Sequence, residues 1–247
     1  MMTLKILGSS SRGNCYLLDN GREALAIEAG VPFAEVKRAV DFDISRIEGC
    51  IVSHEHQDHA KYIHAFLDAR VNVAGSEGTI KSLEYPNYVS PFYLESNHVF
   101  QLGKFSILPF DVQHDAAEPY GFLIHHDEMG TTLFATDTFY LKNTFTGLNQ
   151  IMIECNYRRD ILDANTRSGK IPAAQRNRTL QSHLSYDTCL KTLLANDLSA
   201  VNNIVLIHLS DDNSNAAEFQ AGIQTGTGKT VHVAGKGMRI DFNRTPF

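Results

Sequence analysis

The sequence predicts an α/β fold in which two β-sheets pack together and helices cover their outer faces. Two observations predict this fold. Short apolar or alternating segments recur along the chain and are often bounded by Gly, Asp or Asn, as is typical of β-strands. Segments with apolar residues at helical spacing lie between these strands, which favours layered sheets and helices within one unit. Because the sequence has no internal repeat, low-complexity run or linker, we expect one domain that spans residues 1–247.

The expected elements follow from these patterns in chain order. Strands are expected at residues 4–8, 14–19, 23–29, 49–53, 71–75, 105–110, 121–126, 131–137, 150–155, 203–209, 230–235 and 238–242. Helices are expected at residues 32–42, 61–70, 185–197 and 215–224. Pro32 suits the first turn of the first helix, and Ser185 is a candidate N-cap for the third.

The composition is that of an ordinary globular protein. Of the 247 residues, 43% are hydrophobic, and the net charge is −6, so no strong global field attracts the chain to nucleic acid or to a membrane. No stretch approaches the roughly 18 apolar residues of a membrane span, and the first residues do not resemble a signal peptide. The four cysteines are scattered without paired spacing, which suits reduced thiols. We therefore expect a soluble cytoplasmic protein with no membrane partner, and the sequence leaves protein partners open.

The segment VSHEHQDHA, residues 52–60, concentrates four candidate metal ligands directly after an apolar strand. His54, His56, Asp58 and His59 fall within six positions, at the turn from an expected strand to an expected helix. Imidazole and carboxylate groups are ligands that suit zinc, manganese or iron. A solvated polar loop is the alternative, but four such groups in so short a turn favour metal binding.

Three further candidate ligands end other apolar runs. His114, Asp137 and His208 each follow or end an expected strand, as they would if several strands converged on one rim. Together with the four clustered residues they make seven candidate ligands, which are too many for one tetrahedral ion and enough for two ions that share a carboxylate. The sequence thus indicates two divalent metal ions, zinc or manganese, or else iron.

The segment SHEHQDH resembles the H-x-H-x-D-H signature of the metallo-β-lactamase superfamily, and the later His, Asp and His follow in that family's order. The segments HDAAEPYGFLI, TDTFY, ECNY, SHLS and HLSDDNSN are similar to its YycJ/WalJ branch of nuclease-like hydrolases. The resemblance covers nearly the whole chain and implies a four-layer αββα sandwich with a dinuclear centre at one edge. It also implies that one ion is bound by His54, His56 and His114, that the other is bound by Asp58, His59 and His208, and that Asp137 bridges them.

Three residues are candidates for catalysis. His183 resembles a histidine that contacts the phosphate in RNase Z-like members of the superfamily, and Glu154 resembles the acid that orients it. Asp58, as a ligand and hydrogen-bond acceptor, could orient the attacking water or take its proton. The alternatives are a surface histidine near a helix cap for His183 and a salt bridge at a strand end for Glu154.

A basic segment suggests how a nucleic acid would be held. Residues 156–180 carry six basic and two acidic side chains in a chain of net charge −6, and we expect them to form a polar loop. Such a loop would track a phosphate backbone through Arg158, Arg159, Arg176 and Arg178, and Tyr157 could stack on a base. A solvated surface loop is the alternative.

These observations favour a dinuclear metal-dependent phosphodiesterase or nuclease that acts on DNA or RNA. A second possibility is a hydrolase of small phosphodiesters, cyclic nucleotides or carboxylic esters such as lactones, with the same metal centre. A third is a binding or regulatory protein with a structural metal, although structural sites are usually closed and mononuclear.

Overall fold

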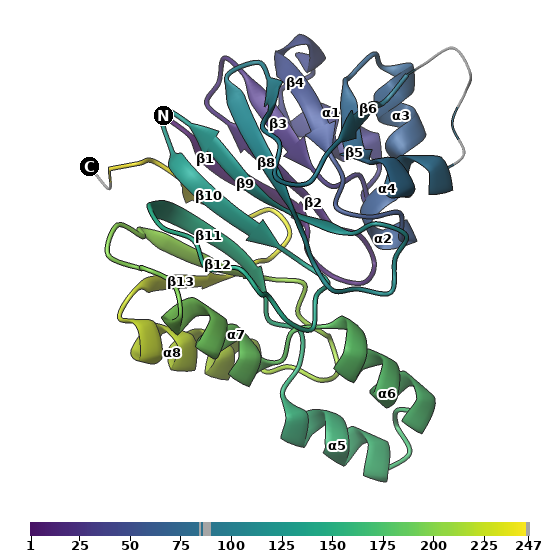
Figure 1. Ribbon diagram of the computed structural model, residues 1–247, viewed down its shortest axis with the longest axis vertical. Coiled ribbons are helices and arrows are strands. Elements are labelled where there is room, and N and C mark those ends of the chain that lie inside the picture. The colour runs from purple at the N-terminus through teal and green to yellow at the C-terminus, as the bar shows by residue number, and fades with distance from the viewer. Residues whose placement is uncertain (84, 86–89, 246–247) are drawn as a thin grey trace.

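The computed structural model describes residues 1–83, 85 and 90–245, and within this range two seven-stranded sheets face each other (Figure 1). The first sheet has the order β14-β1-β2-β3-β4-β5-β6. Its strands are β1 (Thr3–Gly8), β2 (Cys15–Asp19), β3 (Ala24–Ile27), β4 (Ile47–Ile51), β5 (Val73–Ser76), β6 (Phe92–Leu94) and β14 (Arg239–Asp241). The second sheet has the order β13-β12-β11-β10-β9-β8-β7. Its strands are β7 (Phe100–Leu102), β8 (Phe105–Asp111), β9 (Tyr120–His126), β10 (Gly130–Ala135), β11 (Leu148–Glu154), β12 (Asn203–Ile207) and β13 (Thr230–Val233).

Each sheet is part antiparallel and part parallel. In the first sheet β3, β4, β5 and β6 run parallel, and in the second sheet β10, β11, β12 and β13 do so. The remaining strand pairs are antiparallel. The inward faces of both sheets supply one apolar cluster, in which Leu4 and Ile6 of β1 lie with Phe122 and Phe134 of the second sheet. This shared core holds the two sheets together because its side chains are removed from water by both layers.

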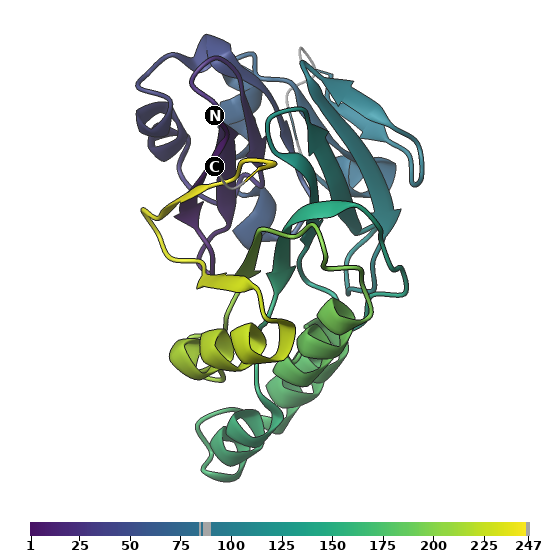
Figure 2. The same ribbon diagram turned by 90° about the vertical axis from the view of Figure 1, so that its left-hand side faces the viewer.

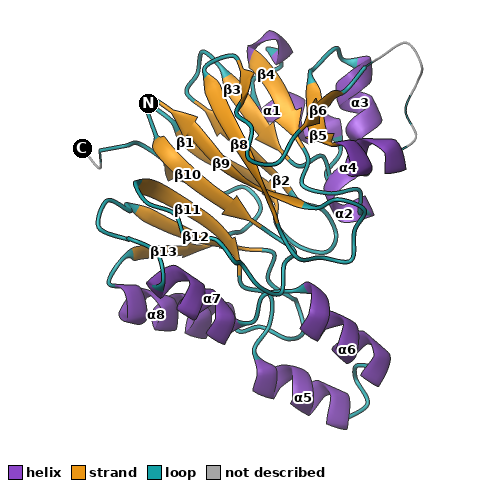
Figure 3. Ribbon diagram, in the orientation of Figure 1, coloured by secondary structure: helices purple, strands orange, loops and turns teal. Residues whose placement is uncertain are grey.

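Helices cover the outer face of each sheet (Figure 3). Beside the first sheet lie α1 (Phe33–Ala39), α2 (Gln57–Ala60), α3 (Ile63–Asp68), α4 (Glu77–Ser82) and the 3-10 turn η1 (Ile44–Arg46). Beside the second sheet lie α7 (Tyr186–Leu194) and α8 (Ala216–Thr227). Separate apolar clusters join each set of helices to its own sheet. The four layers confirm the expected α/β sandwich with helices outside two sheets.

A helical hairpin projects beyond the ends of β11 and β12, where we expected a polar loop. It consists of α5 (Arg159–Arg167) and α6 (Ala173–Ser182), and Figure 2 shows the pair extending from the body of the sandwich. Tyr157, Leu162 and Ile171 form its small apolar core. Tyr157 is only 5% exposed, so the expectation that it stacks on a base is wrong. The hairpin was not predicted because it contains few apolar residues whose spacing could indicate a helix.

The expected strands and helices are present, and besides the hairpin the differences concern short elements. Ser185 caps α7 by accepting a hydrogen bond from the Thr188 backbone N–H, as expected. The expected strands did not include β6 and β7, which have three residues each and too little pattern to be recognised. All four cysteines lie in the described part of the chain and are free. Among the described residues, no helix combines the length and apolar character that crossing a membrane requires.

Candidate metal centre and active site

Strands of both sheets end at one edge of the sandwich, and the seven candidate ligands follow these ends. β4 leads to the histidine cluster, β8 to His114, β10 to Asp137 and β12 to His208. Asp137 and His208 have positive φ angles of 46° and 53°, so the chain turns sharply just after each strand. Such backbone is unfavourable for residues other than glycine and persists only where its surroundings impose it. The turns aim both side chains into the gap between the two sheets.

The first group of ligand atoms comes from His54, His56, His114 and Asp137, and these atoms lie within 4.8 Å of one another. His56 Nδ1 is 3.1 Å from Nε2 of His54 and 3.1 Å from Nε2 of His114. Asp137 Oδ2 lies 3.5 Å from each of these two Nε2 atoms. Three ring nitrogens and a carboxylate oxygen that converge so closely could bind a common cation.

The second group comes from Asp58, His59, Asp137 and His208 and has the same 4.8 Å limit. His59 Nε2 lies 3.2 Å from Asp58 Oδ2 and 3.2 Å from Asp137 Oδ2. His208 Nε2 lies 3.2 Å from Asp58 Oδ2. Asp137 belongs to both groups, which is the arrangement expected of a carboxylate that bridges two ions.

The outer nitrogens of several ligand rings are held by protein groups. His114 Nδ1 donates to the backbone carbonyl of Ser182 at 2.9 Å, and His54 Nδ1 lies 2.9 Å from Ser53 Oγ. Each ring therefore turns its Nε2 toward the cluster, as metal-binding histidines do when an outer partner fixes their tautomer. The donor chemistry, the shared carboxylate and these outer contacts fit a pair of divalent metal ions.

The carboxylates of the cluster are ionised by their surroundings. Burial favours the neutral form of Asp137, but the charges of His208 and His59 and hydrogen bonds with both rings outweigh it and hold its pKa well below the ordinary value. Burial also opposes ionisation of Asp58, yet hydrogen bonds with His208 and His59 lower its pKa strongly. Both groups are thus negatively charged at neutral pH, which is the form that binds a cation.

His183 and Glu154 form a pair beside the second ligand group. His183 Nδ1 lies 2.7 Å from Glu154 Oε1, and Glu154 is fully buried. Burial lowers the pKa of His183, but the charge of Glu154 and its hydrogen bond reverse this effect and raise the pKa above its usual value. The same Glu154 oxygen lies 2.9 Å from His208 Nδ1. A third group of ligand-capable atoms, from Asp137, Glu154, His183 and His208, therefore overlaps the second group.

A cavity of about 210 Å³ opens onto this cluster. Its wall includes three residues of one face of α6, Gln175, Arg178 and Thr179, which sequence reasoning did not single out as a set. Ser11 and Asn213 line it from other loops. The cavity thus joins the candidate ligands, His183 and a cationic helix face in one polar site.

The four arginines proposed for substrate binding are not equivalent. Arg178 lines the cavity and donates to Asp115 at 2.8 Å. Arg158 pairs with Asp160 and Glu218. Both Arg159 and Arg176 pair with Asp163. Local carboxylates therefore offset much of the positive charge of the basic segment, and within the described residues only Arg178 of these four lines the cavity.

Two polar residues support the cluster although sequence reasoning missed them. Glu28 directly follows β3, is fully buried and faces His59, with Oε1 at 3.4 Å from Nδ1. The signal used for the other ligands, a polar residue that ends an apolar run, could have found it. Asn14 lies behind the same ligands, because its Nδ2 donates to Asp58 Oδ2 at 3.2 Å.

Gly30 permits a close backbone approach to the cluster. A Cβ atom at Gly30 would lie 1.8 Å from the carbonyl oxygen of Asp58. Only glycine leaves room for the ligand loop to pack here. The position of Asp58 therefore depends on the absence of a Cβ atom at residue 30.

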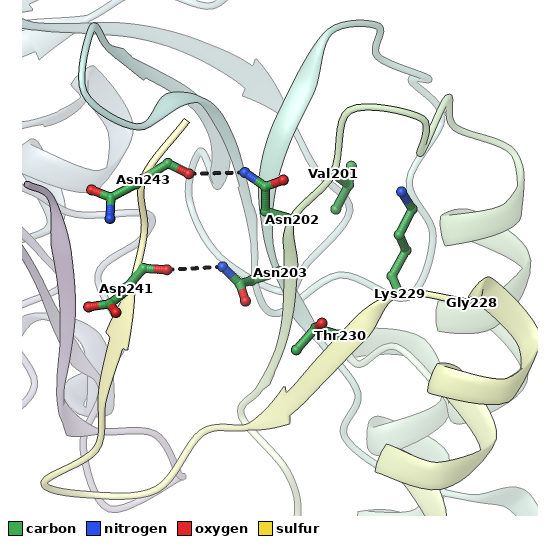
Figure 4. Close-up of a pocket in the computed structure, with 8 residues that line it drawn as sticks. All are labelled: Val201, Asn202, Asn203, Gly228, Lys229, Thr230, Asp241 and Asn243. Carbon is green, nitrogen blue, oxygen red and sulfur yellow. Dashed lines mark hydrogen bonds between the residues drawn. The ribbon is translucent and has the colours of Figure 1, made fainter. Parts of the chain in front are cut away.

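A larger cavity, of about 410 Å³, lies away from these groups at the other end of β12 (Figure 4). Asn202 Nδ2 donates to the carbonyl of Asn243 at 3.0 Å, and Asn203 Nδ2 donates to that of Asp241 at 3.0 Å. Lys229 donates to the carbonyl of Ser199. These groups tie the C-terminal segment to the second sheet, so we interpret this cavity as a structural seam.

Known proteins share this sequence pattern and this fold. The chain is 26% identical over 226 residues to exodeoxyribonuclease WalJ of Streptococcus pneumoniae, which covers 85% of this chain and 82% of the relative. It is 26% identical over 223 residues to exodeoxyribonuclease YycJ of Bacillus anthracis, with 85% of this chain and 83% of the relative covered. The crystal structure of the metallo-beta-lactamase fold protein YhfI from Bacillus subtilis superposes with a TM-score of 0.76 at 16% identity and covers 98% of this chain and 100% of that chain. The family model of the metallo-beta-lactamase superfamily matches residues 10–221, and the chain therefore belongs to this superfamily.

Proposed function

We propose that this protein is a metal-dependent phosphodiesterase that hydrolyses nucleic acid. The observation that carries the proposal is the His183–Glu154 pair, with Nδ1 and Oε1 2.7 Å apart, beside two ligand groups that share Asp137. The pair adds a proton donor to a site that could hold two cations, and hydrolysis of a nucleic-acid phosphodiester, whose leaving group is a poor one, is accelerated by both functions. The exodeoxyribonuclease names of the relatives support the same reaction class.

The two ligand groups would hold two divalent ions, zinc or manganese, or else iron. His54, His56 and His114 would bind one of them, Asp58, His59 and His208 would bind the other, and Asp137 would bind both. When bound, such ions would polarise the phosphate and make a water molecule acidic enough to attack near neutral pH.

The chain's own residues would position the reactants and move the protons. Asp58 Oδ2, which Asn14 holds at 3.2 Å, would accept a hydrogen bond from the attacking water and fix its direction. Glu154 occupies Nδ1 of His183, so Nε2 is the ring atom left to protonate the departing oxygen. Because its pKa is raised, His183 holds this proton more readily at neutral pH than an ordinary histidine would.

Arg178 would bind a phosphate of the substrate at the cavity wall. Its guanidinium now pairs with Asp115, which is 47% exposed, so a phosphate could replace the carboxylate with little loss of hydrogen bonding. Gln175 and Thr179 on the same helix face would add polar contacts. Arg158, Arg159 and Arg176 would contribute mainly to the local field, because they pair with carboxylates and do not line the cavity.

That pairing of the arginines also favours one alternative, hydrolysis of small phosphodiesters, cyclic nucleotides or carboxylic esters such as lactones. A small substrate needs no extended cationic track, and the cavity of about 210 Å³ would admit it. We place the reaction in the cytoplasm, since all four cysteines are free.

A substrate panel tests the proposal. Labelled DNA, labelled RNA, bis-p-nitrophenyl phosphate and a chromogenic lactone are each incubated with metal-stripped protein to which Mn²⁺ or Zn²⁺ is added back. We expect hydrolysis of DNA or RNA that requires metal. Hydrolysis of bis-p-nitrophenyl phosphate without any nucleic-acid cleavage would favour the small-molecule alternative. Hydrolysis of the lactone alone would contradict phosphodiesterase activity.

A further inference from the structure

The loop that follows Asp137, a residue that lines the cavity, exposes two adjacent aromatic side chains. Phe139 is 44% exposed and Tyr140 is 50% exposed. Burial of a large aromatic side chain usually stabilises a protein. Two exposed aromatic neighbours so close to Asp137 therefore suggest a binding surface. Lys142, also exposed, follows them and makes no hydrogen bond or ion pair with the described residues. We call Phe139, Tyr140 and Lys142 the aromatic rim.

The aromatic rim is held firmly between two segments that carry candidate ligands. The Phe139 N–H donates to the carbonyl of Gln113 at 3.2 Å, and Gln113 immediately precedes His114. The Gln113 N–H in turn donates to Thr138 Oγ1 at 3.0 Å. Thr138 is fully buried and Leu141 is 5% exposed within the core of the second sheet. Two buried anchors thus flank the exposed pair and fix its position next to the segments that carry Asp137 and His114.

The rim offers exposed aromatic side chains, which the basic segment lacks because its single aromatic residue, Tyr157, is buried. Four of the five arginines of that segment have carboxylate partners, and Lys142 has none among the described residues. Aromatic faces combined with an unpaired cation are the features that bind single-stranded nucleic acid, because unpaired bases stack on the rings while the cation meets the backbone. A duplex cannot present its base faces in this way, since they are already stacked inside the helix.

We propose that the aromatic rim binds unpaired nucleotides of the substrate, with bases stacked on Phe139 and Tyr140 and a backbone phosphate beside Lys142. This inference rests on the proposed nuclease function and makes it more specific. The substrate that enters the cavity is then a single strand, or the unpaired end of a duplex.

Binding measurements test this inference. Fluorescence anisotropy measures the binding of a labelled oligothymidylate and of a labelled duplex of equal length. The protein is metal-loaded and carries His183→Ala, so that it does not degrade the oligonucleotide during the measurement. We expect tighter binding of the single strand. Combined Phe139→Ala and Tyr140→Ala should weaken single-strand binding by about tenfold or more for each ring. Lys142→Gln should lower the log–log salt slope by roughly 0.7.

Tryptophan fluorescence reports stacking directly, because the natural chain contains no tryptophan. Tyr140→Trp introduces one emitter at the rim, and we expect its emission to be quenched as the oligothymidylate binds. Phe42→Trp is the matched control. Phe42 is 70% exposed and precedes β4, whose opposite end leads to the ligand cluster. Its emission should not change.

The outcomes separate this inference from the function on which it rests. If the protein binds neither single strand nor duplex, the nuclease proposal fails and the rim loses its role with it. If the single strand binds and the double alanine variant binds equally well, or if the emission of the Tyr140→Trp variant does not respond, the stacking inference alone is wrong. A dimer that sedimentation detects and the double variant abolishes, with DNA binding unchanged, would identify the rim as a protein interface instead.

Discussion

The Oε1 atom of Glu28 lies 3.4 Å from Nδ1 of the candidate ligand His59, and both side chains are fully buried. Neither atom has a hydrogen-bond partner among the described residues. A small rotation of the His59 ring would complete the bond and direct Nε2 toward Asp58 and Asp137. Glu28 itself has a positive φ of 69°, so the backbone is strained to place this carboxylate. These features indicate that Glu28 orients His59 for metal binding.

Replacing Glu28 with glutamine should weaken metal binding. Glu28→Gln keeps the shape of the side chain but removes the charge that supports the His59 ring, and loss of such an outer partner typically costs about 10- to 100-fold in metal affinity. Competition with a chromophoric chelator measures the effect. Glu23→Gln is the control, because Glu23 also pairs with a buried histidine, His126, at 3.2 Å but lies outside the ligand groups. Equal losses of metal affinity in both variants would indicate that Glu28 contributes only to the general stability of the fold.

Removing Asp137 should change the number of bound ions. If this carboxylate bridges the two ligand groups, the parent protein should bind about two divalent ions per chain, the number typical of such sites. Asp137→Ala should then lose at least one of them and lower the thermal stability, because metal binding and folding are coupled. Elemental analysis and thermal melts provide the measurement. Asp127→Ala, a change of a carboxylate that is 99% exposed and lies outside the ligand groups, should retain the metal. A single tightly held ion that survives Asp137→Ala would contradict the dinuclear centre.

The sequence predicted most of the strands and a set of candidate ligands that the structure brings into overlapping groups, because both follow simple local rules. A polar residue such as His114 or His208 at the end of an apolar run marks a strand end, and parallel strands bring such ends to one edge. The same rule applies to Glu28, which was missed because its run continued into Ala29. Local pattern therefore contained nearly all the information about which residues meet at this edge.

The sequence could not predict features that depend on contacts between segments far apart in the chain. The pairing of Arg178 with Asp115 spans 63 positions, and no local pattern shows that a carboxylate will neutralise a given arginine. The helical hairpin of α5 and α6 was not predicted because Leu162 and Ile171 give it only a minimal core. The exposure of Phe139 and Tyr140 likewise depends on the way Thr138 and Leu141 are anchored in the folded protein.

Lowering the pH should destabilise the fold by protonating Asp19, which lies outside the candidate ligand groups. Its carboxylate is 2% exposed and bonds Lys5 at 2.7 Å and Arg46 at 2.9 Å. Burial raises the pKa of Asp19, but hydrogen bonds from Lys5 and from the Gly21 backbone, with both cationic charges, lower it overall. Because the folded pKa is lowered, this stability is present above the unfolded value of about 3.9 and is lost as the pH falls through the folded value.

Urea unfolding of metal-stripped protein as a function of pH tests the role of Asp19. Asp19→Asn should destabilise the protein near neutral pH by about 3 kcal/mol, because two largely buried cations lose their partner. The variant should also show a smaller decline of stability below about pH 4 than the parent. Asp127→Asn is the control, since its side chain is 99% exposed. Parallel pH curves for the parent and Asp19→Asn would contradict this assignment.

Arg178 and Arg159 should differ in their effect on nucleic-acid binding although both are surface arginines. Their side chains are 62% and 56% exposed, and each pairs with one carboxylate. Arg178 lines the cavity and Arg159 does not. Arg178→Gln should therefore flatten the log–log salt dependence of binding by roughly 0.7 for a single strand, while Arg159→Gln should leave the slope nearly unchanged. Equal slopes in the two variants would show that the hairpin acts only through its overall field.

His183 should be required for turnover but not for metal binding. His183→Ala should keep the metal content of the parent and lower the rate on an oligonucleotide by roughly 10²- to 10⁴-fold, as expected for loss of a general acid. The loss should be smaller on bis-p-nitrophenyl phosphate, because nitrophenolate departs without a proton and a merely structural residue would affect both substrates alike. His208→Ala should reduce metal content and turnover together. If His183→Ala releases metal, His183 is itself a ligand within the group that contains Asp137, Glu154 and His208, and the assignment of the two late histidines must be exchanged.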